Sequence, residues 1–327
     1  MSWLIWRQHR IELLFVLATV CLCSAFLAFE HISLVGTYSD LGLGKCTSAA
    51  SPACSSNLQA FANQFGWLYV GIYWMLLLPA MFGIFIGAPL IAREVESGSY
   101  RFVWTQSVTR TRWFLSKVVA LIVGAILMTA ALSAVISWAL WPLTRVEGIL
   151  LLPTLNVLTT PLFDLTGAVA LAATALALSL GILAGALTRQ TVLAMVLTVI
   201  VFTAVRIPVA SFLRPHFASP VVTTAAVSLN SDVPVVPNGA WLMKLGFIDG
   251  EGQTFDLIGV ASARCQPYAA DPTALQQCFR EIGLRSFAEY QPADRYWLFQ
   301  GYEAAIYAVL AATALLVAWS AVRWRLA

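Results

Sequence analysis

The sequence predicts an all-α membrane protein with six transmembrane helices, and two observations support this fold class. The 327 residues are 60% hydrophobic and only 11% charged, whereas soluble domains carry about 25% charged residues. Six apolar stretches have about the 20 residues that a helix needs to cross a bilayer. We therefore expect one transmembrane domain over residues 1–327. Its spans are 11–29, 67–92, 118–140, 163–187, 191–212 and 302–322.

The distribution of charge predicts that both termini are cytoplasmic. An even number of spans leaves both ends on one side, and the loops of that side hold ten basic and three acidic residues. The other side holds the remaining nine of 19 basic and thirteen of 16 acidic residues. Loops rich in Lys and Arg stay inside the cell, so we expect a multi-pass protein of the inner (plasma) membrane. The net charge of +3 argues against a nucleic-acid partner, which needs a concentrated basic face.

The first ten residues are expected to form a helix on the inner membrane surface. Trp3 and Trp6 suit the headgroup level, and Arg7 and Arg10 suit anionic lipid. A signal peptide is the competing interpretation. It is disfavoured because no small-x-small cleavage site follows the apolar stretch, whereas five more spans do.

Two regions are expected to lie outside the cell, and each carries a pair of cysteines. They are residues 31–66 and the long, polar stretch 213–301. An oxidising compartment would let each pair close a short loop, so we expect two disulfides rather than four free thiols. The expected pairs are Cys46 with Cys54 and Cys265 with Cys278.

Two further segments are expected to be short helices that do not cross the membrane. Residues 148–158 are apolar but too short to span, and a similar partial helix is expected near 215–229. Either could be re-entrant, provided that protein or water covers its backbone.

Two pairs of glycines favour close packing of helices. They are Gly83 with Gly87 in the second span and Gly181 with Gly185 in the fourth. Such spacing lets two helix backbones approach closely. Packing is the expected role, and contact between two copies of the chain is the alternative left open.

Charges in the spans are few: Glu12 lies near the inner end of the first span, and three others lie near outer ends. Asp164 and Glu303 begin spans at the outer end, and Arg206 lies about 22 Å into the fifth span at 1.5 Å per residue. Snorkelling to the interface would account for each. The functional hypothesis is that these three residues form an outer polar cluster that gates an exit.

The middles of the spans carry no charge, which disfavours several function classes. A proton-coupled transporter needs carboxylates or histidines at mid-depth, and an intramembrane hydrolase needs a nucleophile with a base or a metal motif. The chain has three scattered histidines and no phosphate-binding loop. We therefore predict no catalytic residue, no metal site and no cofactor bound by this chain.

The segment 93–117 is the only substantial cytoplasmic loop expected. Gly98 should end the helix that continues from the second span, and Ser107 or Thr109 should begin the next. A short crosswise helix between them would present charged and aromatic side chains, which are enriched at binding hot spots. A helix lying on lipid headgroups is the alternative. The candidate contact residues are Arg93, Glu94, Glu96, Gly98, Tyr100, Arg101 and Trp104.

Two motifs lie in this loop and two near the ends of the chain. The loop reads Glu94-x-Glu96-x-Gly98-Ser99 and then Ser107-Val-Thr-Arg-Thr-Arg-Trp113. Together they resemble the permease subunits of ABC-2 type transporters. Residues 3–10 and the stretch 290–303 resemble the actinobacterial branch of that family.

This resemblance implies the membrane subunit of an ATP-driven exporter. Two copies of the permease would pair with two copies of a separate ABC ATPase, which would hold ATP and Mg. The loop after the second span would be the coupling helix, seated in a groove of that ATPase. The long exterior region and its cysteine pairs depart from the family pattern, and a substrate or partner particular to this branch is expected there.

The apolar interior suits a hydrophobic or amphipathic substrate such as a drug, antibiotic, peptide or lipid-like molecule. The substrate path is expected along the first, second and fifth spans. Lipid contact or helix packing is the alternative for each side chain. The candidate residues are Phe15, Phe26, Trp74, Met75, Phe82, Phe85, Met195 and Phe202.

Two other function classes remain open at this point. One is a membrane sensor or scaffold whose exterior loops bind a ligand. The other is a lipid-modifying enzyme with catalytic groups outside the membrane, such as His216 with Asp232 or Asp249. Dependence of transport on ATP hydrolysis separates the exporter from both.

Overall fold

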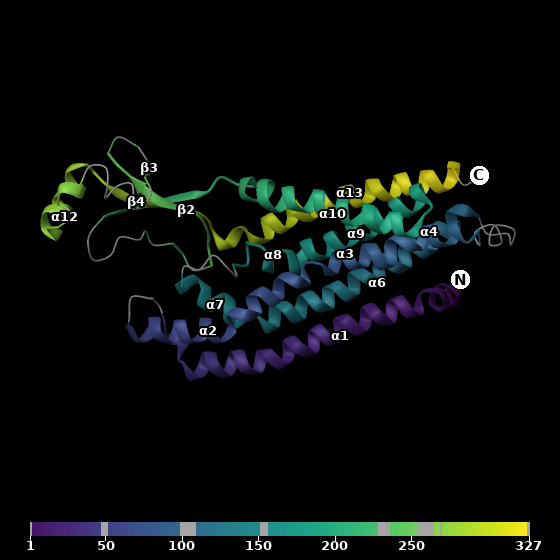
Figure 1. Ribbon diagram of the computed structural model, residues 1–327, viewed down its shortest axis with the longest axis horizontal. Coiled ribbons are helices and arrows are strands. Elements are labelled where there is room, and N and C mark those ends of the chain that lie inside the picture. The colour runs from purple at the N-terminus through teal and green to yellow at the C-terminus, as the bar shows by residue number, and fades with distance from the viewer. Residues whose placement is uncertain are drawn as a thin grey trace.

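Six helices of the computed structural model are long and apolar enough to cross a membrane, within the part of the chain that is described. This confirms the predicted fold class. Both termini lie at one end of an elongated helical bundle, and a β-sheet lies at the other (Figure 1). The described residues are 2–46, 52–98, 109–150, 156–227, 234, 236–237, 239–250, 252, 254–255, 265–268 and 270–325.

The first helix, α1 (Ser2–Asp40), is continuous from the N-terminal residues through the first span. The separate surface helix expected over residues 1–10 is therefore not a distinct element, since no Gly or Pro interrupts the sequence there. α1 also continues past the expected end of the span at residue 29.

The exterior region expected over residues 31–66 is largely a helical hairpin. After the short η1 (Leu43–Lys45), α2 (Pro52–Met75) begins well ahead of the expected span. The reason lies in an apolar stripe at helical spacing, which packs against α1. Its buried members are Leu58, Phe61, Phe65, Leu68 and Ile72.

The second span is interrupted rather than regular. α2 is followed by α3 (Leu78–Phe82), the π-helical segment η2 (Gly83–Gly87) and α4 (Ala88–Glu96). Pro79 and Pro89 lie at the starts of α3 and α4, where a missing backbone N–H costs least. α4 ends as predicted, because Gly98 adopts a left-handed φ of +71°.

The two glycine pairs pack against each other inside one chain. A Cβ on Gly83 would lie 2.5 Å from the carbonyl oxygen of Ala177, and one on Gly181 would lie 2.3 Å from that of Gly83. Backbones this close tolerate only glycine. The pairs therefore hold η2 and α4 against α9 (Gly167–Thr188), which confirms the packing role.

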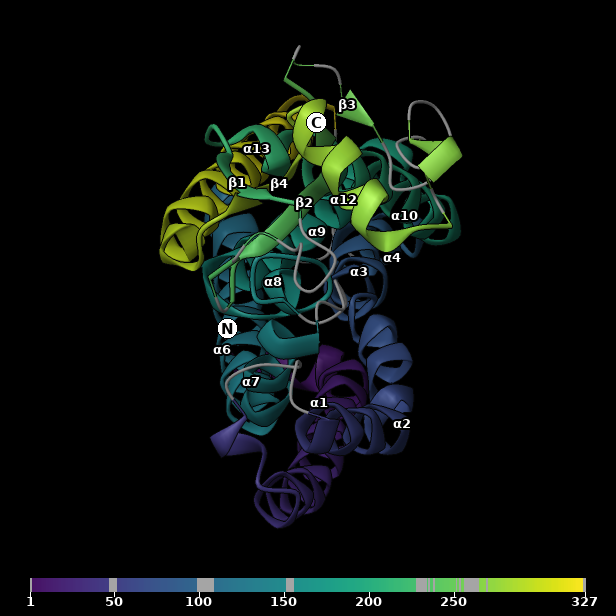
Figure 2. The same cartoon turned by 90° about the vertical axis from the view of Figure 1, so that its left-hand side faces the viewer.

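α9 is the central helix of the bundle. It packs against α3, η2, α4, α6, α10 and α13. Of its most apolar 18-residue stretch 56% is buried, compared with 17% of the corresponding stretch of α1. Figure 2, which views the bundle from the sheet end, shows α9 inside the layer of surrounding helices. The remaining helices are α6 (Arg110–Ala139), α7 (Trp141–Leu150), α8 (Leu162–Leu165), α10 (Thr191–Pro208), η3 (Val209–Leu213), η4 (Arg214–His216) and α13 (Tyr296–Arg325).

Several of these boundaries refine the predicted ones. The Thr109 side chain accepts a hydrogen bond from the backbone N–H of Arg112 (3.3 Å) and caps α6, as expected of one of the two candidate residues. α6 and α13 both begin earlier than the expected spans. The short helix expected over 148–158 is found only in part. α7 begins at Trp141 and ends at Leu150, residues 151–155 lie outside the described residues, and residues 156–158 are not helical.

The exterior region is not the loop with short helices that was expected, but a four-stranded antiparallel sheet with order β1-β4-β2-β3. The partial helix expected near 215–229 is wrong, because η4 ends at His216 and β1 occupies the middle of the segment. Its Val-Val-Thr-Thr run is β-branched, which favours strands, and its burial alternates along the strand. The elements are β1 (Val221–Ala226), β2 (Trp241–Ile248), β3 (Thr254–Phe255), η5 (Gln266–Tyr268), α12 (Pro272–Glu281), β4 (Arg285–Gln291) and η6 (Ala293–Arg295).

Both predicted disulfides are present. Cys46 is bonded to Cys54 at the tip of the α1–α2 hairpin, and Cys265 to Cys278, which joins the segment before η5 to α12. Each bridge closes a short loop, with the paired cysteines 8 and 13 residues apart in the sequence.

Candidate functional site

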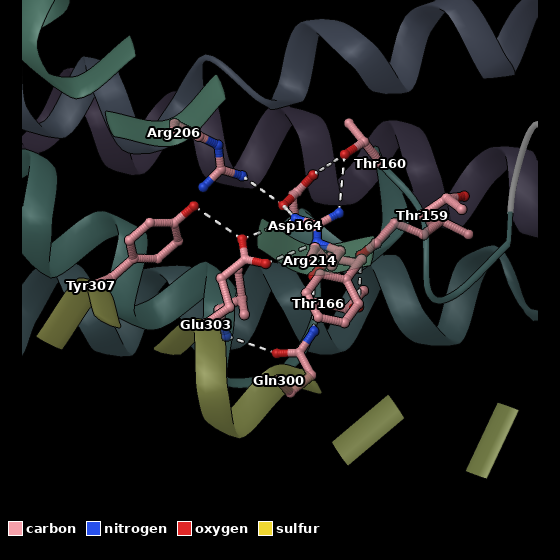
Figure 3. A network of polar contacts seen from close by, with 12 residues as sticks. Thr159, Thr160, Asp164, Thr166, Arg206, Arg214, Gln300, Glu303 and Tyr307 are labelled. Atoms are coloured by element: carbon pink, nitrogen blue, oxygen red, sulfur yellow. Dashed lines mark hydrogen bonds and ion pairs between the residues drawn. The ribbon is translucent and has the colours of Figure 1, made fainter. Parts of the chain in front are cut away.

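A buried charged network, called here the outer cluster, lies where α8, α10, η4 and α13 meet. It consists of Asp164, Arg206, Arg214, Glu303 and Tyr307 (Figure 3). Asp164 and Glu303 are only 1% and 0% exposed. Buried carboxylates are costly unless they are paired and hydrogen-bonded, so the arrangement of their partners decides whether this part of the fold is stable.

Arg214 is the central member of the outer cluster. Its Nε and Nη2 donate to the two carboxylate oxygens of Glu303 (2.8 and 2.9 Å), and its Nη2 also donates to Asp164 Oδ1. Its Nη1 donates to the Thr160 hydroxyl (3.2 Å). The guanidinium lies 4.2 Å from the ring centroid of Phe163. One side chain thereby joins α8 to α13 through charge-assisted hydrogen bonds.

Arg206 and Tyr307 complete the outer cluster. Arg206 Nη2 lies 3.3 Å from Asp164 Oδ1, and the Tyr307 hydroxyl donates to Glu303 Oε1 (2.9 Å). The cluster holds two carboxylates and two guanidiniums, so its net charge is zero. Pairing within the protein therefore replaces the water that these charges lose on burial.

Polar side chains next to the outer cluster fix the break between α8 and α9. Gln300 accepts from the backbone N–H of Val169 (2.8 Å) and donates to the carbonyl of Phe163 (2.9 Å). The hydroxyls of Thr166 and Tyr296 lie 2.9 Å apart. Backbone groups freed at the helix break thus find partners on α13, as buried backbone groups require.

The structure brings together the three residues that the sequence singled out, Asp164, Arg206 and Glu303. Their side chains meet inside the bundle and do not extend separately to the interface. Arg214 was missed, because it follows the expected end of the fifth span and was counted with the exterior region. Its signal was the apolar Phe212-Leu213 pair directly before it, which continues the span. A gating role for the cluster stays a prediction.

A second pair of contacts, called here the inner contacts, lies at the end of the bundle that holds the termini. The first is an ion pair between Glu94 at the end of α4 and Lys117 in α6. Both residues are buried, at 8% and 5% exposure. Lys117 Nζ also lies 4.9 Å from the ring centroid of Trp113, a cation–π geometry.

The other inner contact joins α4 to α10. Glu96 Oε2 accepts from the backbone N–H of Thr191 (3.3 Å) and from its hydroxyl (2.7 Å). Thr191 is the first residue of α10, where backbone donors are free and a negative charge is favoured. The carboxylate of α4 therefore caps α10.

These contacts revise part of the predicted coupling surface. Glu94 and Glu96 were expected to face a partner protein, but the structure gives both carboxylates partners inside this chain. Their i, i+2 spacing on α4 directs them to two different helices. Arg93 is exposed beside them. The other predicted contact residues, Tyr100, Arg101 and Trp104, lie outside the described residues.

The predicted substrate-path residues do not lie on one wall. Phe82 and Phe202 are buried in two separate apolar clusters, and Met75 and Met195 are partly buried beside different clusters. Other members are exposed on the outer surface of the helices, and the side chain of Phe15 lies outside the described residues. The exposed members are Phe26, Trp74 and Phe85.

A small cavity lies beside the outer cluster between α1, α3, α6 and α9. Its volume is about 20 Å³, and Phe82, Thr129, Asp164 and Thr174 are among its lining residues. The hydroxyls of Thr129 and Thr174 lie 3.1 Å apart. This volume suits about one water molecule, so the cavity is too small to be a path for a substrate.

The residues of the enzyme alternative are not brought into a catalytic arrangement by the described part of the chain. His216 Nδ1 contacts the carbonyl oxygen of Phe212 in the preceding turn (2.7 Å). Asp249 is buried after β2, and Asp232 lies outside the described residues. Among the residues described, no three His, Cys, Asp or Glu side chains gather at a metal-binding distance.

Residues 17–214 match the protein family described as ABC-2 membrane transporter related. The match begins in α1 and ends at Arg214, so it covers most of the bundle together with three of the four charged residues of the outer cluster. The exterior sheet and α13 lie beyond it. Comparison with curated proteins and with solved structures gives no match.

Proposed function

Because the chain belongs to the ABC-2 membrane transporter related family, we propose that it is the permease subunit of an ATP-driven exporter. The family match is the observation that carries this proposal, since it spans more than half of the chain. The position of the loop between α4 and α6 supports it. α4 ends and α6 begins at the end of the bundle that also holds both termini (Figure 1), and this is the end with the basic loops.

In this proposal the segment 93–117 couples the permease to two copies of a separate ABC ATPase. Arg93, Gly98, Tyr100, Arg101 and Trp104 are the proposed contact residues. Glu94 and Glu96 do not contact the ATPase in this proposal. They attach the end of α4 to α6 and to α10. A push on the loop would then reach three helices at once, and ATP and Mg would stay on the partner.

The proposed cargo is a hydrophobic or amphipathic molecule that leaves the cell at the outer ends of α10 and α13. The outer cluster joins α10 and α13 to α8 and η4 there. In this proposal the network controls the exit, because it must rearrange before these helices can separate.

We further propose that two permeases associate as a homodimer in the plasma membrane. Their contact would not use the glycine pairs, which are filled by packing inside one chain. Apolar faces of α1 and α10 are exposed in a single copy, and either lipid or a second copy would cover them.

Co-purification tests the exporter proposal. The chain would be expressed with the ATPase encoded beside it, extracted in mild detergent and weighed by native mass spectrometry. Two permeases with two ATPases, and ATPase activity that responds to candidate substrates, are the expected results. A lone permease unaffected by the ATPase would contradict the proposal and favour the sensor or the enzyme.

A loop variant adds a matched control to that experiment. Arg101→Glu with Trp104→Ala should reduce the yield of the complex, because both residues lie in the proposed contact segment. Arg285→Glu, at an exposed site of β4, reverses a charge outside that segment and should leave the yield unchanged. Equal loss in both variants would contradict the placement of the contact.

A further inference from the structure

The two arginines of the outer cluster differ in how their hydrogen-bond donors are used. All three nitrogens of the Arg214 guanidinium donate to side chains, those of Glu303, Thr160 and Asp164. Arg206 Nη1 and Nη2 are buried and donate no hydrogen bond within the described part of the chain. Arg206 forms an ion pair with Asp164, whose Oδ1 lies 3.3 Å from Nη2. Buried donors without an acceptor are costly, so this guanidinium is suited to an additional acceptor.

The cluster does not need Arg206 to keep its carboxylates paired. Asp164 Oδ1 also accepts from Arg214, and its Oδ2 accepts from the Thr160 hydroxyl (2.5 Å). Both oxygens of Glu303 accept from Arg214. Arg206 can therefore turn to another anion while each buried carboxylate keeps a cation and hydrogen bonds.

Apolar and aromatic side chains flank Arg206 on the side away from Asp164. Its guanidinium lies 5.8 Å and 6.0 Å from the ring centroids of Phe202 and Tyr307. Val199 precedes Arg206 by two turns of α10, which places it on the same face of the helix, and it is 40% exposed. A ligand lying along this face would place its apolar tail against these side chains and its polar head at the buried donors of the Arg206 guanidinium.

We propose that Arg206 binds the anionic head of an amphipathic ligand, a carboxylate or a phosphate on an apolar tail, at the outer end of α10. A guanidinium forms paired, parallel hydrogen bonds with either group, and low local polarity strengthens them. This inference rests on the proposed export function, since the ligand bound by Arg206 would be the exported molecule. A membrane lipid has the same chemistry, so the test must separate the two sources from each other and from a soluble anion.

A matched pair of probes tests this site on the full-length chain. Purified protein in neutral detergent would be titrated with oleate or with oleyl alcohol, which share a tail but differ in charge, and thermal unfolding would be followed by tryptophan fluorescence. Oleate should raise the unfolding midpoint more than oleyl alcohol does. Arg206→Gln should weaken the response to oleate roughly tenfold or more, since hydrogen bonds to charged groups are strong. Arg206→Lys should restore part of it.

Control variants and two further arms make the result decisive. Arg295→Gln, which removes an exterior arginine bonded to the carbonyl of Ser219, should leave the response to oleate unchanged. If lipid also fills the site, nanodiscs of phosphatidylglycerol should stabilise the wild type relative to nanodiscs of phosphatidylcholine. Arg206→Gln should show no such difference. The inference would be overturned if Arg206→Gln responded to oleate as the wild type does. It would also be overturned if inorganic phosphate alone raised the unfolding midpoint as much as oleate does. None of these arms needs the ATPase, so their failure would leave the exporter proposal to its own test.

Discussion

The inner contacts and the outer cluster use buried charge in different ways. At the inner end, Glu94 pairs with Lys117 and Glu96 binds Thr191, so each carboxylate of α4 holds one other helix. At the outer end, Arg214 serves Asp164 and Glu303 together, and neither carboxylate depends on a single donor.

The difference indicates what each end is built to do. A one-to-one contact can be made or broken without disturbing another, which suits a segment that moves against its neighbours. In a shared network the loss of Arg214 would take partners from Asp164 and Glu303 at once. We therefore expect the outer cluster to hold α8, η4 and α13 together until it rearranges as a unit, while the inner contacts carry motion from α4. Five predictions test this comparison and the fold around it.

The largest effect is expected at Arg214. Arg214→Gln leaves two buried carboxylates without their main cation, and breaking such a pair costs about 3–5 kcal/mol. The variant should show a strongly lowered unfolding midpoint in detergent. Arg206→Gln is the matched control, and its loss should be much smaller because Arg214 remains. If the two variants lose equal stability, the network is not centred on Arg214.

The next effect is expected at the Glu94–Lys117 pair. Glu94→Lys places two cations in one buried site, and we expect a loss of about 3 kcal/mol. The double variant Glu94→Lys with Lys117→Glu should recover much of the loss, because the contact is one-to-one.

An exchange at the outer end sharpens the contrast. Asp164→Arg with Arg214→Asp should recover nothing, since the new aspartate would face Glu303 without a cation between them. The comparison uses the thermal unfolding midpoints of Glu94→Lys, Asp164→Arg and the two double variants. Recovery at the outer end, or none at the inner end, would contradict the difference drawn between the two regions.

A smaller effect is expected at Glu96. Glu96→Gln keeps an acceptor for Thr191 but loses the charge at the α10 N-terminus, whereas Glu96→Ala loses both. We expect costs of about 0.5 and 1 kcal/mol. Hydrogen exchange at the first turn of α10 measures them locally. Faster exchange in neither variant would show that Glu96 does not hold α10.

The smallest effect is expected outside the membrane, where Asp271 caps α12. The Thr273 hydroxyl and backbone N–H donate to its carboxylate (2.6 and 2.9 Å), and these hydrogen bonds lower the pKa of Asp271 below its usual value. A lowered folded pKa means that the stabilisation is complete above the unfolded pKa of about 3.9. It is lost as pH falls through the lower folded value.

Hydrogen exchange of α12, corrected for its intrinsic pH dependence, tests this sign. In the wild type, protection of the α12 amides should decrease as the pH falls below about 4, the range in which an aspartate titrates. Asp271→Asn keeps an acceptor but cannot titrate, so its protection should stay flat. A decrease of the same size in Asp271→Asn would assign the pH dependence to another group.

Much of the membrane fold could be read from local sequence. Apolar length located the six spans, Gly98 and Thr109 marked the helix ends around the loop between α4 and α6, and the cysteine positions gave both disulfides. The hairpin of α1 and α2 was missed beyond the membrane, although the spacing of Leu58, Phe61 and Phe65 carried its signal. The sheet was missed because its strands pair over long separations, such as Val222 with Glu289.

The sequence by itself determined the six apolar spans, the helix ends at Gly98 and Thr109, and that Asp164, Arg206 and Glu303 lie near the same ends of their spans. These follow from length, capping and rise per residue, which are local properties. Only the tertiary structure decided the partners. Arg214 is 50 residues from Asp164 and 89 from Glu303, and no local rule links groups so far apart. Packing on α9 brings them together, because a buried charge is stable only where the fold supplies its counter-charge.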